Sequence, residues 1–120
     1  MNSNKKQWDI WELVAINYLQ KKWYKILDTN FKYWRFWEID IVSKIANLTV
    51  FIEVKYRENL NFWTPEESIT KSKLAKFSKT IDYYCFKNNI STERIRFDAI
   101  TILKWEKSYK LKHYENLSLR

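Results

Sequence analysis

Two acids and a lysine in the middle of the chain have the types and the spacing of a metal-dependent hydrolytic site. Asp40 lies in segment 38–42, and Glu53 and Lys55 lie two residues apart in segment 51–57. Side chains two apart on a strand point to the same face, so Glu53 and Lys55 would stand together. Carboxylates bind hard divalent cations, and an ammonium group can stabilise a hydroxide or the charge that builds on a phosphate. We therefore expect this segment to hold a divalent cation and to activate a water molecule.

Two strands and a short connection must position these three groups. Apolar and polar residues alternate in the first strand, and segment 43–48 is a polar connection of hairpin length. Antiparallel pairing would bring Asp40 beside the face that carries Glu53 and Lys55, and the carbonyl of Val54 could add a third oxygen ligand. The alternative is an edge hairpin whose solvent face carries an ordinary ion pair, and the rest of the chain has to decide between them.

Two amphipathic helices are predicted to flank these strands. Apolar residues at mixed spacings of three and four predict a helix over 5–21, with Glu12 near its start. A second helix is predicted to start at Thr64 and to reach about residue 87. Thr64 is a suitable N-cap and Pro65 suits the first helical position.

Further strands are predicted over 24–27, 94–103 and 109–114, with a turn over 28–30. The order is therefore helix, three strands, helix, and one or two strands. This order indicates an α/β fold in which helices cover a mixed sheet. A chain of 120 residues is expected to form one domain spanning 1–120.

The charge of the chain favours an anionic partner. The formal net charge is +8, which makes DNA or RNA the default expectation, although solubility explains part of such an excess. Four lysines of the second helix are the expected phosphate contacts, and the alternative is an ordinary solvated helix face: Lys71, Lys73, Lys76 and Lys79.

The location is expected to be cytoplasmic. The one cysteine, Cys85, lies in an apolar helical pattern typical of a buried thiol, which fits a reducing compartment. No apolar run is long enough for a membrane span, and no signal peptide is expected at the N-terminus. The sequence is compatible with either a monomer or a homodimer.

Taken together, five motifs in their order and spacing resemble the YraN-like family, also called uncharacterised protein family 0102. The likeness runs from about Trp8 to Leu119. Its motifs are Glu12 on the first helix, Glu38-Ile39-Asp40, Phe51-Ile52-Glu53-Val54-Lys55 with Arg57, Thr70 with Lys73, and Arg96-Phe97-Asp98. The resemblance implies a fold similar to the restriction-endonuclease-like PD-(D/E)xK nucleases and Holliday junction resolvases.

What the resemblance implies for function is a nuclease-like protein that uses Mg²⁺ or Mn²⁺ to hydrolyse phosphodiester bonds. Asp40 and Glu53 would hold the metal, with Glu12 as the helix acid that completes the site and Lys55 as the catalytic cation. The alternative is a nucleic-acid-binding module of the same fold that does not cut. A purely structural interaction protein would leave the clustering of these charged residues unexplained.

Three further residues take their expected roles from the same resemblance. Lys73 matches a basic residue at the start of the second helix, and Arg57 is a further expected nucleic-acid contact. His113 falls in the C-terminal segment, where its ring is expected to pack or to make a hydrogen bond.

The resemblance also implies glycine at positions where this chain has tryptophan. These positions are Trp8, Trp11, Trp23, Trp37 and Trp63, and Trp34 and Trp105 stand in turn-like contexts that also suit glycine. The chain contains 7 Trp and no Gly, whereas average usage would give about eight glycines. We hypothesise that UGA codons meaning glycine are read here as tryptophan. The alternative is a genuinely Trp-rich protein that binds bases or lipid by stacking.

Overall fold

The computed structural model describes residues 10–58 and 71–117, which form two helices and five strands. In chain order the elements are α2 (Ile10–Lys21), β1 (Lys25–Phe31), β2 (Ile39–Ile45), β3 (Leu48–Arg57), α4 (Lys71–Asn88), β4 (Ile95–Trp105) and β5 (Ser108–Tyr114). This is the expected α/β order. Within the described residues, no helix is both long and apolar enough to cross a membrane.

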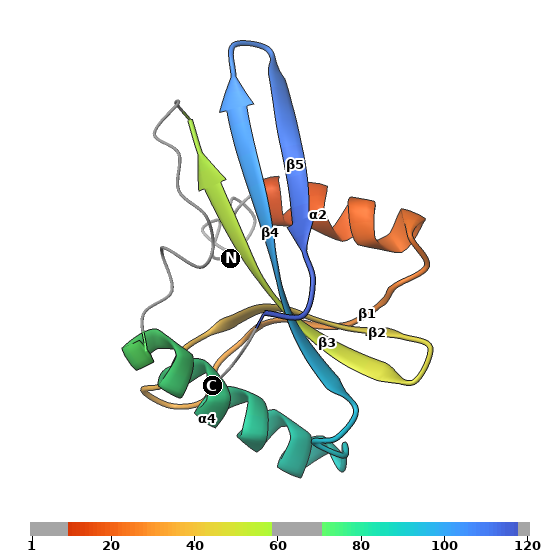
Figure 1. Cartoon of the computed structure of the whole chain (residues 1–120), viewed down its shortest axis with the longest axis vertical. Coiled ribbons are helices and arrows are strands. Elements are labelled where there is room, and N and C mark those ends of the chain that lie inside the picture. Colours follow the sequence, from red (N-terminus) through yellow and green to blue (C-terminus); the bar gives the residue numbers. More distant parts are fainter. Residues whose placement is uncertain (1–9, 59–70, 118–120) are drawn as a thin grey trace, which may run out of the picture.

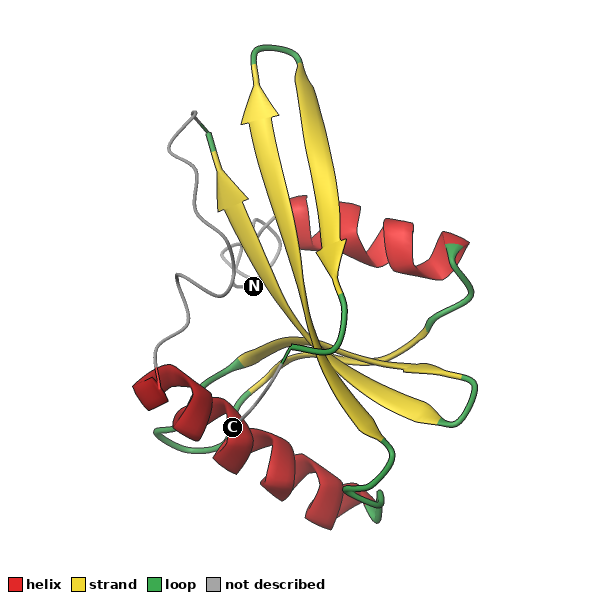
Figure 2. Ribbon diagram, in the orientation of Figure 1, coloured by secondary structure: helices red, strands yellow, loops and turns green. Residues whose placement is uncertain are grey.

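The strands form one mixed sheet in the order β1-β2-β3-β4-β5. Neighbouring strands run antiparallel except β3 and β4, which pair in parallel over Thr49 to Arg57 and Ile95 to Leu103. A parallel pair needs a long crossover connection, and α4 lies in the connection between β3 and β4. Helices α2 and α4 lie on opposite sides of the sheet (Figures 1 and 2).

Each helix covers one face of the sheet and buries its own apolar cluster. Ala15 and Leu19 of α2 pack on a face that includes Ile41, Ile52 and Ile100. The other face is covered by α4, whose buried residues include Phe77 and Ile81, packed with Val42, Phe51 and Phe97. The central strands are therefore buried on both faces, which explains why β3 reads as a nearly continuous apolar run.

Two local predictions about the strands are wrong. Residues 28–30 do not form a turn, because β1 continues to Phe31 after an irregularity in its pairing between Ile26 and Asp28. The connection between β2 and β3 is also shorter than expected, because β2 extends to Ile45. The chain then turns at Ala46, whose φ is 53°. The predicted helix start at Thr64 and Pro65 lies outside the described residues.

Two of the tryptophans occupy backbone that favours glycine. Trp23 has φ 74° and Trp34 has φ 54°, and their side chains are 88% and 76% exposed. Trp23 ends α2: its N–H donates to Gln20 O, and the N–H of Tyr24 donates to Leu19 O, which is the Schellman arrangement with Trp23 at the left-handed position.

The other tryptophans are placed differently. Trp11 stacks on Tyr56 at 4.8 Å between ring centroids, and Trp37 packs edge-on against Phe77 at 5.1 Å. Both rings are half-buried and neither residue has a positive φ, so the backbone at these two positions does not favour glycine. Trp105 ends β4 outside the left-handed region. Trp8 and Trp63 lie outside the described residues.

Replacing Trp23 by glycine is expected to stabilise the protein. A side chain with a Cβ costs about 1 kcal/mol or more in the left-handed region, and the exposed indole offers little packing in return. The melting temperature should rise by about 3 to 6 °C. Asn89, which has the same role at the end of α4 with φ 58°, shows the kind of residue that suits the position. Trp105→Gly is the matched control and should give no gain. An unchanged or lower melting temperature for Trp23→Gly would remove the physical support for the misread-codon hypothesis.

Candidate functional site

Asp40 sits where β2 begins, just before regular pairing with β3 starts. The described register of this pair begins at Ile41 and Ile52. Before that point, the backbone N–H of Val54 donates to Asp40 Oδ2 at 2.8 Å instead of to a backbone carbonyl. A backbone donor from β3 therefore fixes the Asp40 carboxyl against the neighbouring strand.

Glu53 is the buried member of the site. Its side chain is only 7% exposed, and its Oε2 forms an ion pair with Lys55 Nζ at 3.1 Å. The side chains of Glu53 and Asp40 lie within hydrogen-bonding reach of each other. Glu53 Oε1 is buried and has no hydrogen-bond partner among the described residues. The hairpin thus brings Asp40, Glu53 and Lys55 into one cluster, the acid pair with its lysine.

Burial raises the pKa of both acids, so they hold protons more tightly than usual. Burial, followed by the charge of Asp40, raises the pKa of Glu53 to about 8. Burial also raises the pKa of Asp40, although the N–H of Val54 opposes the shift. Two carboxylates both accept hydrogen bonds, so they satisfy each other only when one of them carries a proton. The raised pKa values of both acids therefore favour one proton shared by the pair near neutral pH.

A divalent cation fits the acid pair in one respect. Once Glu53 is ionised, its buried Oε1 is an acceptor without a donor among the described residues, and a hard cation would satisfy it. However, residues 10–58 and 71–117 contain no group of three His, Cys, Asp or Glu side chains that could hold a metal ion. A metal here would need water, backbone or substrate oxygens to complete its shell.

Glu12 is buried on α2 and is held by Asn30. The amide of Asn30, near the end of β1, donates to both carboxylate oxygens of Glu12 at 3.2 Å. Glu12 therefore does not form a three-acid cluster with Asp40 and Glu53 in the described part of the chain. Its role as a metal ligand stays a prediction. The sequence predicts only a turn at Asn30, and nothing in the neighbouring residues identifies it as the partner of Glu12.

The basic residues expected to bind nucleic acid are not all in one place. Lys76 and Lys79 are exposed on α4, and Lys73 lies over the ring of Trp37 at 5.7 Å. Lys71 begins α4, but its side chain is outside the described part. Arg57 is exposed at the end of β3, which points away from α4 (Figure 1).

The raised pKa of Glu53 predicts a stability that falls with rising pH. Between its ordinary value of 4.5 and about 8 the folded state binds more protons than the unfolded state. The free energy of unfolding must therefore fall across that window. Glutamine does not titrate, so Glu53→Gln should not lose stability across this window, and its amide N–H can donate to Asp40. Its stability advantage over the wild type should grow from pH 5 to pH 8 by at least about 1.4 kcal/mol, the equivalent of one pKa unit.

Chemical denaturation of the two proteins at several pH values measures this difference. Glu93→Gln, at an exposed acid in the loop before β4, is the matched control and should show no such trend. A constant difference between Glu53→Gln and the wild type across the window would contradict the assigned protonation of the acid pair.

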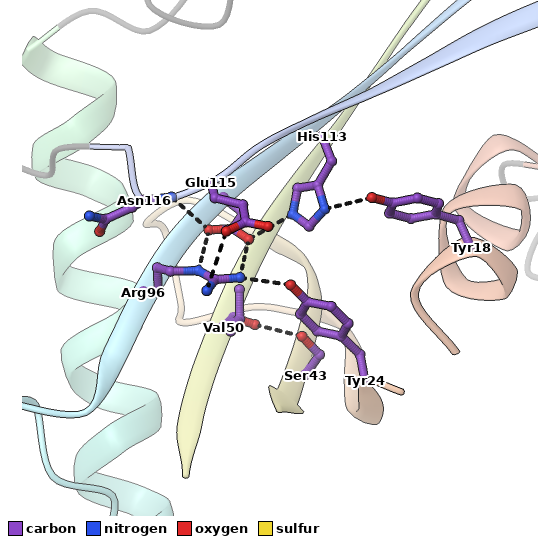
Figure 3. A network of polar contacts seen from close by, with 9 residues as sticks. Tyr18, Tyr24, Ser43, Val50, Arg96, His113, Glu115 and Asn116 are labelled. Atoms are coloured by element: carbon purple, nitrogen blue, oxygen red, sulfur yellow. Dashed lines mark hydrogen bonds and ion pairs between the residues drawn. The ribbon is translucent and has the colours of Figure 1, made fainter. Parts of the chain in front are cut away.

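A second polar cluster surrounds the buried carboxylate of Asp98 on β4 (Figure 3). Arg96 donates to it from Nε and Nη2, both at 2.9 Å, and the backbone N–H of Asn116 donates at 2.9 Å. His113 Nε2 lies 2.7 Å from Asp98 Oδ2. Burial alone would raise the pKa of Asp98, but the bonds from His113, Arg96 and Asn116 outweigh it and lower the pKa.

The ionised state of Asp98 fixes the roles of its neighbours. Because Asp98 accepts, His113 must carry a hydrogen on Nε2, and in the neutral ring Nδ1 then accepts from the Tyr18 hydroxyl at 3.0 Å. Arg96 also donates to the Tyr24 hydroxyl at 2.7 Å. The expectation that His113 makes a hydrogen bond is confirmed. The cluster joins α2 and the segment after it to β4 and β5, so it stabilises the position of α2 on the sheet.

Comparison with known proteins places the chain in one group of relatives. A family model described as Uncharacterised protein family UPF0102 matches residues 11–102. A UPF0102 protein of Clostridioides difficile strain 630 is 40% identical over 114 residues, which cover 95% of this chain and 97% of the relative. UPF0102 proteins of Alkaliphilus oremlandii and Flavobacterium psychrophilum are 38% and 35% identical, over 94% and 88% of this chain and 97% and 87% of theirs.

Proposed function

The chain belongs to the uncharacterised protein family UPF0102, and we propose that it binds nucleic acid and hydrolyses phosphodiester bonds with the help of Mg²⁺ or Mn²⁺. The observation that carries this proposal is the acid pair with its lysine. Two carboxyls that lie together, one of them with a buried oxygen that lacks a donor among the described residues, are costly for a fold to keep without a use. The mixed sheet flanked by helices is compatible with a restriction-endonuclease-like fold.

The residues of the site divide the work by their environments. Asp40, held by the N–H of Val54, and Glu53, through Oε1, would be the ligands of the metal ion. The metal would supply a Lewis acid and a water of lowered pKa. Lys55, with 22% of its side chain exposed, can remain paired with Glu53 and still face a phosphate oxygen. Metal binding also requires Glu53 to lose its proton, so affinity should rise towards pH 8.

The charge of the protein supports nucleic acid as the substrate. The net charge of +8 attracts polyanions, and the exposed lysines on α4 offer phosphate contacts. Binding by these contacts releases counterions, so affinity should fall steeply with salt. Such a protein would act in the cytoplasm, where its substrates are found.

A nucleic-acid-binding module that does not cut is the second candidate. One observation favours it: the described residues contain no group of three His, Cys, Asp or Glu side chains that could hold a metal ion. The lysines would then bind the phosphates of nucleic acid without hydrolysis.

A cleavage assay separates these two candidates. The protein, with glycine restored at Trp23 and Trp34, is incubated with branched, single-stranded and duplex DNA and RNA in Mg²⁺, in Mn²⁺ or in EDTA. Cleavage that depends on the metal supports the nuclease. Binding without cleavage under all conditions supports the module, and the absence of binding at low salt would reject both.

A further inference from the structure

The connection after β1 runs beside α4 (Figure 1), and aromatic rings and lysines from the two segments contact one another there. We call this region the aromatic–lysine surface, and its members come from the end of β1, the β1–β2 connection and α4: Phe31, Tyr33, Phe36, Lys79, Tyr83 and Lys87. Neither the acid pair nor the cluster around Asp98 includes any of these residues.

The rings of this surface are arranged for stacking. Tyr33 and Tyr83 are parallel within 8°, with centroids 4.1 Å apart. Phe31 lies 6.2 Å from Tyr83 at an interplanar angle of 21°, and Phe36 lies 5.3 Å from Tyr33. All four side chains are half-buried, so part of each remains accessible. Parallel aromatic side chains at a surface are a platform on which a flat ring can be added.

Cations alternate with these rings. Lys79 lies over Phe36 at 5.2 Å, and Lys87 lies over Phe31 at 6.0 Å. Both lysines are exposed and stand four residues from Tyr83 on either side, so the three residues share one face of α4. Asp82 is an exposed acid beside this face, and its charge is outnumbered by those of the two lysines.

The surface lies close to the acid pair. The hydroxyl of Thr80, on α4, donates to the carbonyl of Trp37 at 2.6 Å and so fixes the connection against the helix. Phe36, the member of the surface nearest to Asp40 in the sequence, precedes it by four residues, and even an extended chain of that length spans only about 14 Å. A ligand held on the aromatic–lysine surface is therefore close enough to extend to Asp40.

We propose that the aromatic–lysine surface binds unpaired nucleotides, whose bases stack on Tyr33 and whose phosphates contact Lys79 and Lys87. This deepens the proposed function, on which it rests. Bases in a duplex already stack on their neighbours, so only single-stranded or locally unpaired nucleic acid can use the rings. The lysines bind phosphates of either kind of strand.

Binding measurements on the full chain test this surface. The probes are a single-stranded DNA that contains 2-aminopurine and a blunt duplex of the same sequence, both in EDTA, so that hydrolysis plays no part. Tyr33→Leu should weaken binding of the single strand about tenfold, because a stacked base is lost. It should change binding of the duplex less than twofold. Tyr33→Phe keeps the ring and is the matched control, expected to retain the affinity and the 2-aminopurine quenching of the wild type.

Each outcome separates the surface from the function it serves. Equal loss of affinity for both probes, or no loss for either, overturns stacking on Tyr33 while leaving nucleic-acid binding in place. Binding of neither probe by the wild-type protein rejects the proposed function together with the surface. Phe36→Leu, made in parallel, should also weaken binding of the single strand more than binding of the duplex. It replaces Tyr33→Leu as the test if Tyr33→Leu is unfolded at the assay temperature.

Discussion

Asp40→Asn is expected to lower metal-dependent cleavage by at least about 100-fold, the loss typical when a charged group at the reacting centre is removed. Asparagine has nearly the shape of aspartate and its carbonyl can still accept from the N–H of Val54. Its neutral carbonyl lacks the negative charge of a carboxylate, so it should hold a divalent cation much more weakly. The local backbone should therefore survive while the chemistry is lost. The measurement is the rate of substrate cleavage in Mg²⁺ at saturating enzyme.

Binding and a neighbouring acid provide the controls for this loss. Affinity for nucleic acid in EDTA should stay within about twofold, because Asp40 contributes no phosphate contact. Asp28→Asn changes an exposed acid on β1 whose carboxylate accepts from the N–H of Thr29, a bond that asparagine also makes. It should keep full activity. Cleavage by Asp40→Asn at the wild-type rate would reject the metal-ligand role of Asp40 and the assignment of cleavage to the acid pair.

The acid pair could be predicted from the sequence because local rules determine it. Glu53 and Lys55 share a face through the two-residue period of a strand, and a short connection leaves antiparallel pairing as the only option for β2 and β3. These constraints operate within 20 residues of chain. The irregular start of β2, where Asp40 takes the N–H of Val54, follows from tertiary pairing, and the residue pattern predicts only that the two acids lie near each other.

The contacts that the sequence did not predict are those between distant segments. Asn30 looks like a turn residue because asparagine favours turns, yet in the fold it lies on a strand and binds Glu12, 18 residues away. The pairing of Tyr33 with Tyr83 joins a connection to a helix across 50 residues. No periodicity relates such positions, so only the packing of α2 and α4 on the sheet brings them together.

The Schellman end of α2 shows a different limit of sequence reasoning. The resemblance implies glycine at Trp23, and the left-handed φ of 74° at this position agrees. The same expectation fails for Trp11 and Trp37, whose rings pack against Tyr56 and Phe77. A ring that gains contacts offsets the backbone preference, so stability changes can test the codon hypothesis only at exposed positions such as Trp23 and Trp34.

Asp98→Asn is expected to cause the largest loss of stability of any change considered. The carboxylate is fully buried and accepts from two atoms of Arg96, from His113 and from the backbone of Asn116. The amide N–H groups of asparagine would face the N–H donors of these neighbours. The partly buried guanidinium of Arg96 would also lose the negative charge of Asp98. Breaking a buried pair in this way costs roughly 3 to 5 kcal/mol, a large part of a typical total of about 5 to 15 kcal/mol.

Thermal unfolding followed by circular dichroism measures this loss, which should lower the melting temperature by at least about 10 °C. Glu115→Gln is the matched control in the same cluster: its carboxylate is 56% exposed and 3.7 Å from Arg96, so its removal should cost less than about 1 kcal/mol. If Asp98→Asn melted within a few degrees of the wild type, the cluster around Asp98 would contribute little to stability.

Asp98→Asn also tests the position of α2. Tyr18 is linked to Asp98 through His113, so loosening of this cluster should expose Tyr18 to solvent.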